Sequence, residues 1–259
     1  MSANTFSGNV RIAQVNADGV VQGSFIGVVN TTKLELVVPA PTNIDQISRK
    51  NGTVGQIVSR AQVPKATSLN VDIDDTDDQR ILAYALNGVT ASYSQAGGSI
   101  TDEVITAPTQ FGDWAVLANR HVSSVVVKDS TGTTTYIAGT DYVVDAVPGF
   151  IRIVEGGAIT SAESLKVSYT AAAITGKSVQ GAKVASNLLR IEGQLTSLVD
   201  GSEWYFVCPI FQASSSGNQD LFGSKMLVAS LAGAMFLPPT GTAADTETGG
   251  APFVLTAIQ

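Results

Sequence analysis

The segment LLRIEGQLTSLVDGSEWYFVCPIFQ, residues 188–212, constrains the fold more than any other part of the chain. Two strand-like runs flank Asp200-Gly201, a dipeptide that favours the tight turn of a β-hairpin. The second run, from Trp204 to Phe211, is apolar at consecutive positions, so neither of its faces suits water. A strand buried on both faces is central in its sheet. The sequence therefore predicts a sheet of several strands with this hairpin in its interior.

A second strand pattern is present in SLNVDIDD, residues 68–75, where apolar and polar residues alternate. This period of two is typical of a strand with one buried and one hydrated face. The buried face is predicted to contain Leu69, Val71 and Ile73, and the hydrated face Asn70, Asp72 and Asp74.

The next segment, DDTDDQRILAYALNG, gives the best helix signal in the chain. Asp75 or Thr76 can cap the helix, and the acidic residues lie at the positive end of its dipole. Gly88 predicts where the helix ends. The predicted apolar stripe contains Ile81, Leu82, Ala85 and Leu86. We expect this to be the one short α-helix of a mainly β protein.

Residues from about 108 to 169 have the pattern of a small all-β module. Strand-like runs recur every eight to twelve residues between turn residues, as they do in a sandwich. SLKVSY alternates strictly, whereas FIRIV, residues 150–154, has a single charge at Arg152 and predicts a more deeply buried strand. The module contains no nucleophile, base or metal-ligand set, so its expected role is to display surface.

The chain is therefore expected to form a β-rich domain split by an insertion. Its two parts are residues 1–105 and 173–259, and the inserted module is 106–172. Two further segments read as arms or long loops. Residues 42–66 form a polar stretch too long for an ordinary connection, and PPTGTAADTETGGAPFVL, residues 238–255, is rich in Pro, Gly and Thr.

Composition and charge exclude several functions. The net charge of −7 lacks the positive footprint of a nucleic-acid binder, although DNA could pass by without binding. His121 is the single histidine and Cys208 the single cysteine, so neither a His-dependent triad nor a disulfide can form within one chain. The aspartates of residues 72–78 lack the spacing of a calcium loop. We expect no catalytic, metal or cofactor-binding residue, and no enzyme.

Neither a targeting segment nor a membrane span is predicted. MSANTFSGNV lacks a basic stretch followed by an apolar core, so it does not resemble a signal peptide. The longest apolar run, Met226 to Leu237, falls short of the about twenty residues that cross a bilayer. Assembly in a cytoplasm is the expectation.

The order of these patterns resembles the major tail (tail tube) proteins of tailed bacteriophages. SLNVDIDDTDDQRILAYALNG is similar to their strand-then-helix segment, and residues 188–236 to their closing strands. The inserted module is similar to β modules grafted onto phage virion proteins. The resemblance implies a β-sandwich or barrel-forming subunit in hexameric rings. These rings would stack into a tail tube whose lumen passes DNA, without specific binding, and the tape measure protein. A tail sheath and a tail terminator are further partners it allows.

From these patterns we derive two candidate surfaces. Asn70, Asp72 and Asp74 are expected to face the lumen, where they would repel phosphate. Arg49, Lys50, Arg60 and Lys65 are expected to contact the next ring, with a disordered surface loop as the alternative for that segment. A different class of function stays open: a receptor- or carbohydrate-binding fibre or decoration protein, in which the module is the working part. A hydrolase on the virion is a third hypothesis.

Overall fold

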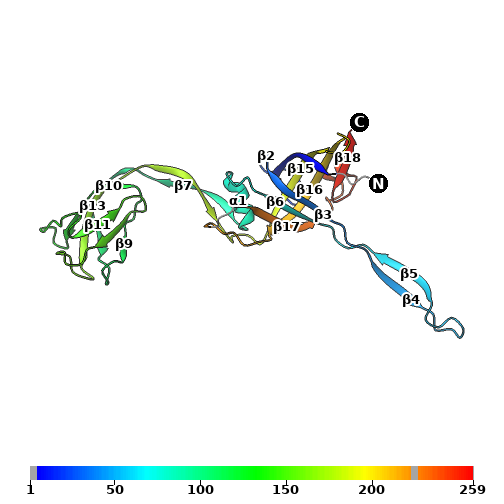
Figure 1. Ribbon diagram of the computed structural model, residues 1–259, viewed down its shortest axis with the longest axis horizontal. Helices are drawn as coiled ribbons and strands as arrows, with labels where there is room; N and C mark the ends of the chain where they lie inside the picture. Colours follow the sequence, from blue (N-terminus) through cyan, green and yellow to red (C-terminus); the bar gives the residue numbers. More distant parts are fainter. Residues whose placement is uncertain (1–4, 223–226, 259) are drawn as a thin grey trace. The chain divides into compact units, whose positions relative to one another are not determined.

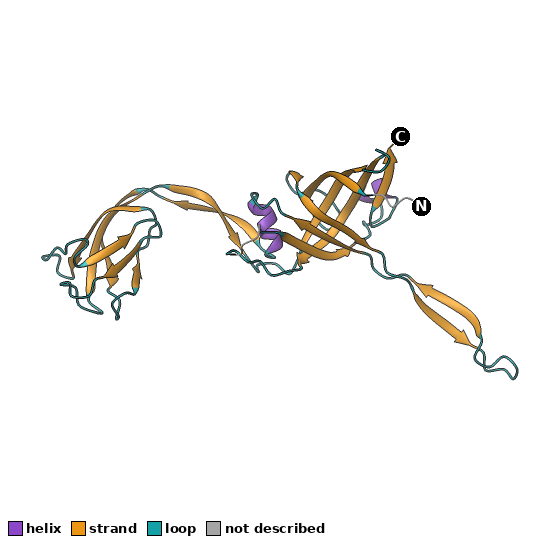
Figure 2. Ribbon diagram, in the orientation of Figure 1, coloured by secondary structure: helices purple, strands orange, loops and turns teal. Residues whose placement is uncertain are grey.

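The computed structural model describes residues 5–222 and 227–258. Outside these ranges lie both ends of the predicted split domain, residues 1–4 and 259, and the start of the longest apolar run, Met226. The described chain is mainly β with two short helices, which confirms the predicted class (Figure 2). It forms two compact units. We call residues 1–91 with 179–259 the split unit, and residues 92–178 the inserted unit.

The split unit contains one eight-stranded sheet (Figure 1). Its strand order is β2-β1-β15-β16-β17-β6-β3, and β18 joins by pairing with β16. The bounds are β1 (Phe6–Gln14), β2 (Ile26–Val29), β3 (Thr31–Val37), β6 (Ser68–Ile73), β15 (Asn187–Ser197), β16 (Glu203–Ser215), β17 (Ala229–Met235) and β18 (Val254–Ile258). All the pairings are antiparallel.

The predicted central hairpin is confirmed. β15 and β16 pair around Asp200-Gly201, where Gly201 has a φ of 72°, which suits glycine. Residues 206–211 of β16 are buried without interruption, and Phe206, Cys208 and Phe211 belong to the core of the split unit. The largest fully buried side chains of the split unit include Phe206 and Phe211.

The sheet curls but does not close. β16 pairs with β18 along residues 203–207 and with β17 along residues 211–215, so the sheet divides at this strand. At the other side only Asn30 separates β2, which pairs with β1, from β3, which pairs with β6. A chain that bends between two partners in this way turns the corner of a sandwich. No ladder in the described ranges joins β3 to β1.

Helix α1 (Gln79–Ala85) follows β6 as predicted, with a different cap and a different buried face. The Asp78 carboxylate caps it by accepting from the Arg80 backbone N–H at 2.8 Å. The buried residues are Ile81, Ala83, Tyr84 and Ala85, so the predicted positions Leu82 and Leu86 are only half-buried.

The helix ends at Ala85, three residues before the predicted Gly88. Asn87, with a φ of 47°, takes the left-handed position, and the Gly88 N–H reaches the Ala83 carbonyl at 2.7 Å. Gly88 is required for a different reason: a Cβ there would lie 2.4 Å from the Gln180 carbonyl oxygen.

The expectation of a C-terminal arm is wrong. Residues 243–248 form a second helix, α2 (Ala243–Thr248), and β18 then pairs with the first half of β16. Phe253 packs against Phe206 with ring centroids 6.3 Å apart. The apolar tip of this segment therefore packs on the core of its own chain, and the described residues form two helices where one was expected.

Residues 42–63 are also not a loop. They form a two-stranded hairpin of β4 (Thr42–Ile47) and β5 (Ile57–Val63). Every residue from Ala40 to Ala66 is exposed except Ser48. No face of this hairpin is buried, so its strands lack the apolar alternation that predicts a half-buried strand. The disordered-loop alternative is wrong as well.

The inserted unit is a small sandwich with its own core. One sheet has the order β10-β13-β8 and the other β11-β12-β9. The bounds are β8 (Gly98–Thr106), β9 (Trp114–Val116), β10 (Val122–Asp129), β11 (Tyr142–Asp145), β12 (Phe150–Ile153) and β13 (Ser164–Ala171). Residues from both sheets, such as Val127, Ile151 and Leu165, share one core. The chain enters and leaves through β7 (Val89–Gln95) and β14 (Ile174–Gln180), which pair with each other.

Two details differ from the sequence expectation. The compact unit is wider than the predicted 106–172, because β8 lies before residue 106 and pairs with β13. Phe150 is only half-buried: β12 alternates, with Ile151 and Ile153 in the core and Phe150 and Arg152 on the outer face. The strand is thus less buried than its apolar run suggested.

Candidate assembly surfaces

The hydrated face of β6 is a polar strip that continues onto β3. Leu69, Val71 and Ile73 are fully buried, whereas Asn70 and Asp72 point to the opposite, half-exposed face. This confirms the alternation on which the lumen assignment depends, although the lumen itself stays a prediction. Asp74 follows the strand and accepts a 2.7 Å hydrogen bond from the Asn30 amide.

The strip is held together by short polar contacts across β3 and β6. The Asn70 amide donates to Glu35 at 2.9 Å, and Glu35 pairs with Lys33 at 2.8 Å. The hydrogen bond from Lys33, together with the one from Asn70, lowers the pKa of Glu35. Lys33 lies opposite Asp72 in the ladder. The strip thus carries three carboxylates and one cation, and keeps a negative balance.

The four residues predicted to stack rings lie in three different parts of the β4–β5 hairpin. Arg49 and Lys50 lie at its tip, Arg60 lies within β5, and Lys65 follows the strand. Arg60 already forms a two-point ion pair with Asp45 on β4, at 2.7 and 3.0 Å. Its hydrogen bond holds the pKa of Asp45 below the usual value. Within the part of the chain that the structure describes, Arg49, Lys50 and Lys65 have no ion pair.

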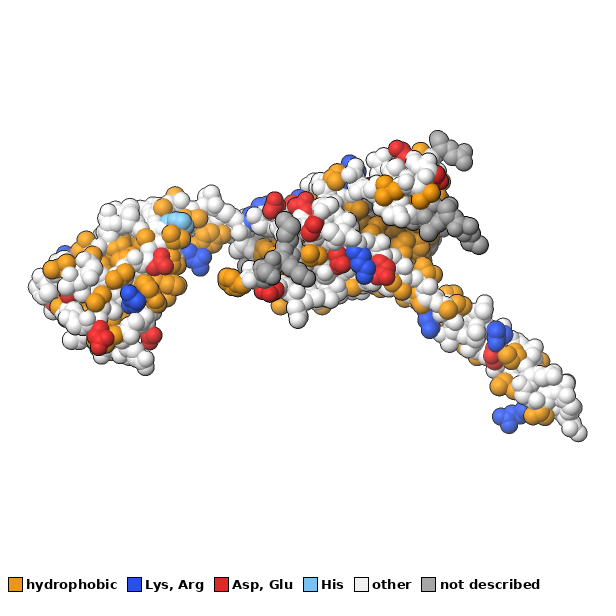
Figure 3. All heavy atoms as spheres, in the orientation of Figure 1, with side chains coloured by type: hydrophobic (Ala, Val, Ile, Leu, Met, Phe, Trp, Pro, Cys, Tyr) orange, Lys and Arg blue, Asp and Glu red, His pale blue; other side chains and the backbone are white. Residues whose placement is uncertain are grey.

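Exposed apolar side chains accompany these charges along the hairpin. They are Ile44, Ile47, Val54, Ile57, Val58 and Val63. Figure 3 shows hydrophobic and basic side chains along this segment. An isolated two-stranded hairpin is marginal in water. In this hairpin the six large aliphatic side chains stay exposed, and such a patch is typical of a surface that contacts another protein. The tip is nevertheless ordered by local contacts, including a 2.8 Å bond between the Ser48 and Thr53 hydroxyls.

Free strand edges are the second kind of assembly surface. Among the described strands, β3 pairs only with β6, β18 only with β16, and β2 only with β1. A hollow of about 300 Å³ separates Phe6–Gly8 of β1 from Thr31–Leu34 of β3. Leu255 and Ile258 of β18 are 43% and 48% exposed. These edges present unpaired backbone groups, which is the property that allows strands of another chain to add.

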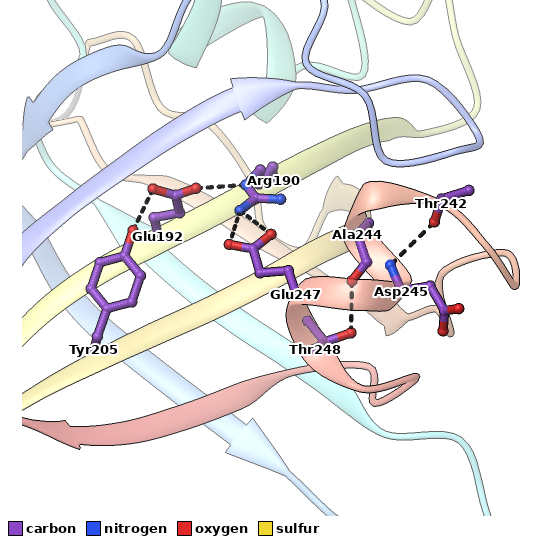
Figure 4. Close-up of polar contacts among 8 residues, drawn as sticks. All are labelled: Arg190, Glu192, Tyr205, Thr242, Ala244, Asp245, Glu247 and Thr248. Atoms are coloured by element: carbon purple, nitrogen blue, oxygen red, sulfur yellow. Dashed lines mark hydrogen bonds and ion pairs between the residues drawn. The ribbon is translucent and has the colours of Figure 1, made fainter.

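The C-terminal segment is fastened to the sheet by a polar network (Figure 4). Arg190 on β15 binds both oxygens of Glu247 on α2, at 2.7 and 2.6 Å, and Glu192 Oε1 at 2.6 Å. The Tyr205 hydroxyl donates to Glu192 at 2.7 Å. Burial and this hydrogen bond raise the pKa of Tyr205 to about 12. The Arg190 side chain is only 10% exposed, so the network is a structural clamp.

The remaining polar candidates do not form a chemical site. Cys208 is fully buried, and burial raises the pKa of its thiol to about 12. His121 is exposed on the inserted unit. Within residues 5–222 and 227–258, no group of three or more His, Cys, Asp or Glu side chains is arranged to hold a metal ion. The helices found in the same ranges are too short or too polar to cross a membrane.

A family model matches residues 4–193, and its description is protein of unknown function UCP028589. The chain belongs to this family. The matched range spans the whole inserted unit and ends within β15. A comparison with curated proteins finds no match.

Two assembly features were missed from the sequence although signals for them were present. Asn51-Gly52 is a strong hairpin dipeptide between β4 and β5. Thr242-x-x-Asp245 is a helix-start pattern, and the Thr242 hydroxyl accepts from the Asp245 N–H at 3.1 Å. The Arg190–Glu247 pair joins residues far apart in the chain and had no local signal.

Proposed function

We propose that the chain is a structural subunit of a phage-type tail tube, assembling into rings through its free strand edges. The curled and unclosed sheet of the split unit carries this proposal. A sheet that stops short of closure, with three edges free, exposes backbone groups that a neighbouring subunit can pair. In a closed ring every subunit uses the same two edges, so the ring has no open end.

The resemblance to tail tube proteins sets the expected ring at six subunits. Support from the chain is physical and independent of that number. The edges of β3 and β18 belong to different parts of the divided sheet, so one copy can present one edge and accept the other. Leu255 and Ile258 would then be covered, which removes exposed apolar area.

Stacking of rings is the role we assign to the β4–β5 hairpin. A ribbon exposed on both faces gains stability when a neighbouring ring covers its aliphatic side chains. Arg49 and Lys50 at the tip are the charges that remain available for the next ring. Arg60 is engaged with Asp45, so we assign it to the hairpin's own structure.

The polar strip on β6 suits the wall of the lumen. Asn70, Asp72 and Asp74 share its hydrated side with Glu35, and the strip has a negative balance. Repeated around each ring and along a tube, such a wall repels phosphate and allows DNA and a tape measure protein to slide past. The location that follows is the virion tail, after assembly in the host cytoplasm.

The first test is the particle itself. Negative-stain images and native mass measurement of the purified chain should show six-membered rings or stacked tubes. Leu255→Lys should give monomers that keep their fold, because the side chain is exposed and the new charge opposes strand addition. Val104→Lys is the matched control on the inserted unit, since Val104 is also exposed. Monomer alone at high concentration would contradict the proposal.

The same images separate ring formation from stacking. Arg49→Glu combined with Lys50→Glu should leave single rings, and the tubes of the unsubstituted chain should shorten as salt rises. Tubes of unchanged length and salt resistance would show that the hairpin does not take part in stacking. Discrete monomers or trimers with intact fold would favour the alternative, a fibre or decoration protein that binds a receptor or carbohydrate.

A further inference from the structure

A hollow of about 540 Å³ lies on the inserted unit, next to the outer face of the β11-β12-β9 sheet. Its apolar walls are Tyr93, Val116, Pro148 and Phe150, and its polar walls are Arg120 and His121. Pockets of a few hundred Å³ with aromatic walls and a few placed polar groups are typical of small-ligand sites. Hydrophobic side chains gather on the face of the inserted unit seen in Figure 3.

The polar wall is fixed before any ligand arrives. The Gln95 side chain accepts from the Arg120 N–H at 2.9 Å and donates to the Arg120 carbonyl at 2.8 Å. The backbone N–H of His121 donates to the Val147 carbonyl at 2.9 Å, and the backbone carbonyl of His121 accepts from the Ala172 N–H. His121 has a φ of 48°, an unusual conformation for a residue with a side chain. These bonds fix the backbone of Arg120 and His121, the two adjacent residues whose side chains line the rim.

The charges near the hollow show which ligand it suits. Arg120 lies 6.0 Å from the centre of the Tyr93 ring, and in the described chain it has no carboxylate partner. A guanidinium stacked on a ring still presents N–H groups along its edge for a carboxylate. On the neighbouring ladder Arg152 stacks over Trp114 at 5.2 Å, again without an ion pair among the described residues.

The surroundings disfavour a polyphosphate. Asp145 lies opposite Phe150 in the β11–β12 ladder, so its exposed carboxylate shares that outer face. Residues 92–178 contain more acidic than basic residues. A ligand with several phosphates would be repelled, whereas one carboxylate can bind one arginine. Hydroxyl groups can use both a carboxylate and an imidazole as partners.

We propose that this hollow binds an acidic saccharide, one whose sugar rings carry a carboxylate. The apolar C–H face of a sugar ring stacks on Phe150 or Tyr93, the carboxylate pairs with Arg120, and the hydroxyls bond to His121. The inference concerns the inserted unit alone and does not depend on tube formation.

The test uses the full chain and two pairs of ligands that differ in charge. Trigalacturonate is compared with its neutral methyl ester, and 3′-sialyllactose with lactose, by isothermal titration calorimetry. At least one acid should bind, and its neutral counterpart should bind about tenfold more weakly or not at all, as expected for loss of a charge-assisted hydrogen bond. Equal binding of acid and neutral partner, or no binding of either acid, would overturn the proposal.

Three variants locate the site. Arg120→Gln should weaken binding of the acid about tenfold and leave any binding of the neutral ligand unchanged. His121→Gly should also weaken binding, and it should fold normally because glycine accepts the local φ. Lys177→Gln removes the same charge from an exposed site on β14 and should have no effect. If Arg120→Gln instead reduced self-association and left saccharide binding unchanged, the surface would be a protein interface, and the proposal would fail.

Discussion

Two arginine–carboxylate pairs in this chain have similar donor–acceptor distances and different surroundings. Arg60 uses Nε and Nη2 on one oxygen each of Asp45, whereas Arg190 places Nη2 alone between both oxygens of Glu247. Arg60 holds Asp45 across the β4–β5 hairpin at 2.7 and 3.0 Å, and Arg190 holds Glu247 of α2 at 2.7 and 2.6 Å. The side chain of Arg60 is 45% exposed, and that of Arg190 is 10% exposed. Both segments looked like arms in the sequence, yet one is open on both faces and the other is part of the core.

An arginine–carboxylate ion pair does not by itself decide whether a segment packs against the core. The C-terminal segment also supplies Phe253 for Phe206 and a strand for the edge of β16. The Arg190 side of its ion pair is therefore largely desolvated, whereas Glu247 keeps 39% of its side chain exposed, so the pair is costlier to break than one whose arginine is hydrated. The hairpin supplies aliphatic side chains that remain exposed in the part of the chain that the structure describes. Its ion pair remains hydrated and weak.

The largest effect is expected for Arg190→Ala. The change leaves Glu192 and Glu247 without their shared cation. Because Glu247 is 39% exposed, the loss is that of charge-assisted hydrogen bonds, about 1.5–3 kcal/mol of unfolding free energy. Urea unfolding followed by Trp204 fluorescence would measure it, in a Trp114→Phe background so that only the split unit reports. Arg190→Lys is the matched control, which keeps the charge but not the planar fork and should lose less.

A second readout of the same change is protease cleavage between α2 and β18. Release of the clamp should expose residues 249–253 to cleavage in the folded protein. If Arg190→Ala lost under about 1 kcal/mol, the network would behave like a surface pair. The distinction between the two segments would then fail.

A smaller effect follows from Tyr205, which belongs to the clamp and has no counterpart in the hairpin. Burial and the bond to Glu192 raise its pKa to about 12, above the usual value near 10. Its contribution to stability is therefore fully present below pH about 10 and is lost as the pH rises through about 12. Tyr205→Phe cannot ionise and should lack this loss.

The measurement is the difference in unfolding free energy between the unsubstituted chain and Tyr205→Phe. The difference should be constant from pH 7 to about 9 and shift in favour of Tyr205→Phe above about 10. Other tyrosines of the chain are common to both proteins, so they cancel. A difference that does not change with pH would show that the hydroxyl is not held in the clamp.

Sequence patterns predicted the parts of the fold that bury one face or both. The alternation at Leu69, Val71 and Ile73 and the apolar run of β16 report burial directly, so both strands were found. The β4–β5 hairpin buries nothing, and its strands were therefore read as a loop. The clamp depends on Arg190 and Glu247, which are distant in sequence, so only the folded chain brings them together.

The same limit applies to the candidate surfaces. The hydrated face of β6 could be assigned from its period, whereas the position of Arg49 and Lys50 at the tip of a hairpin was not predicted. The pairing of Arg60 with Asp45 could not be assigned, because it requires the hairpin register. Phe150 was placed in the core by its apolar neighbours, whereas strand alternation puts it on the outer face beside the hollow of the inserted unit.

The smallest effect is expected for Arg60→Ala, measured as a double-mutant cycle with Asp45→Ala. In the separate subunit the coupling energy should be at most about 1 kcal/mol and should fall as salt rises, because both side chains remain hydrated. A coupling energy well above about 1 kcal/mol would show that the Arg60–Asp45 pair is not a hydrated surface pair.

The same double-mutant cycle can be repeated on assembled particles. A neighbouring ring that covers the hairpin removes water from this pair, so the coupling measured from the stability of the assembled form should exceed that of the subunit. An unchanged coupling would mean that the hairpin stays hydrated after assembly, and its aliphatic side chains would then need another partner.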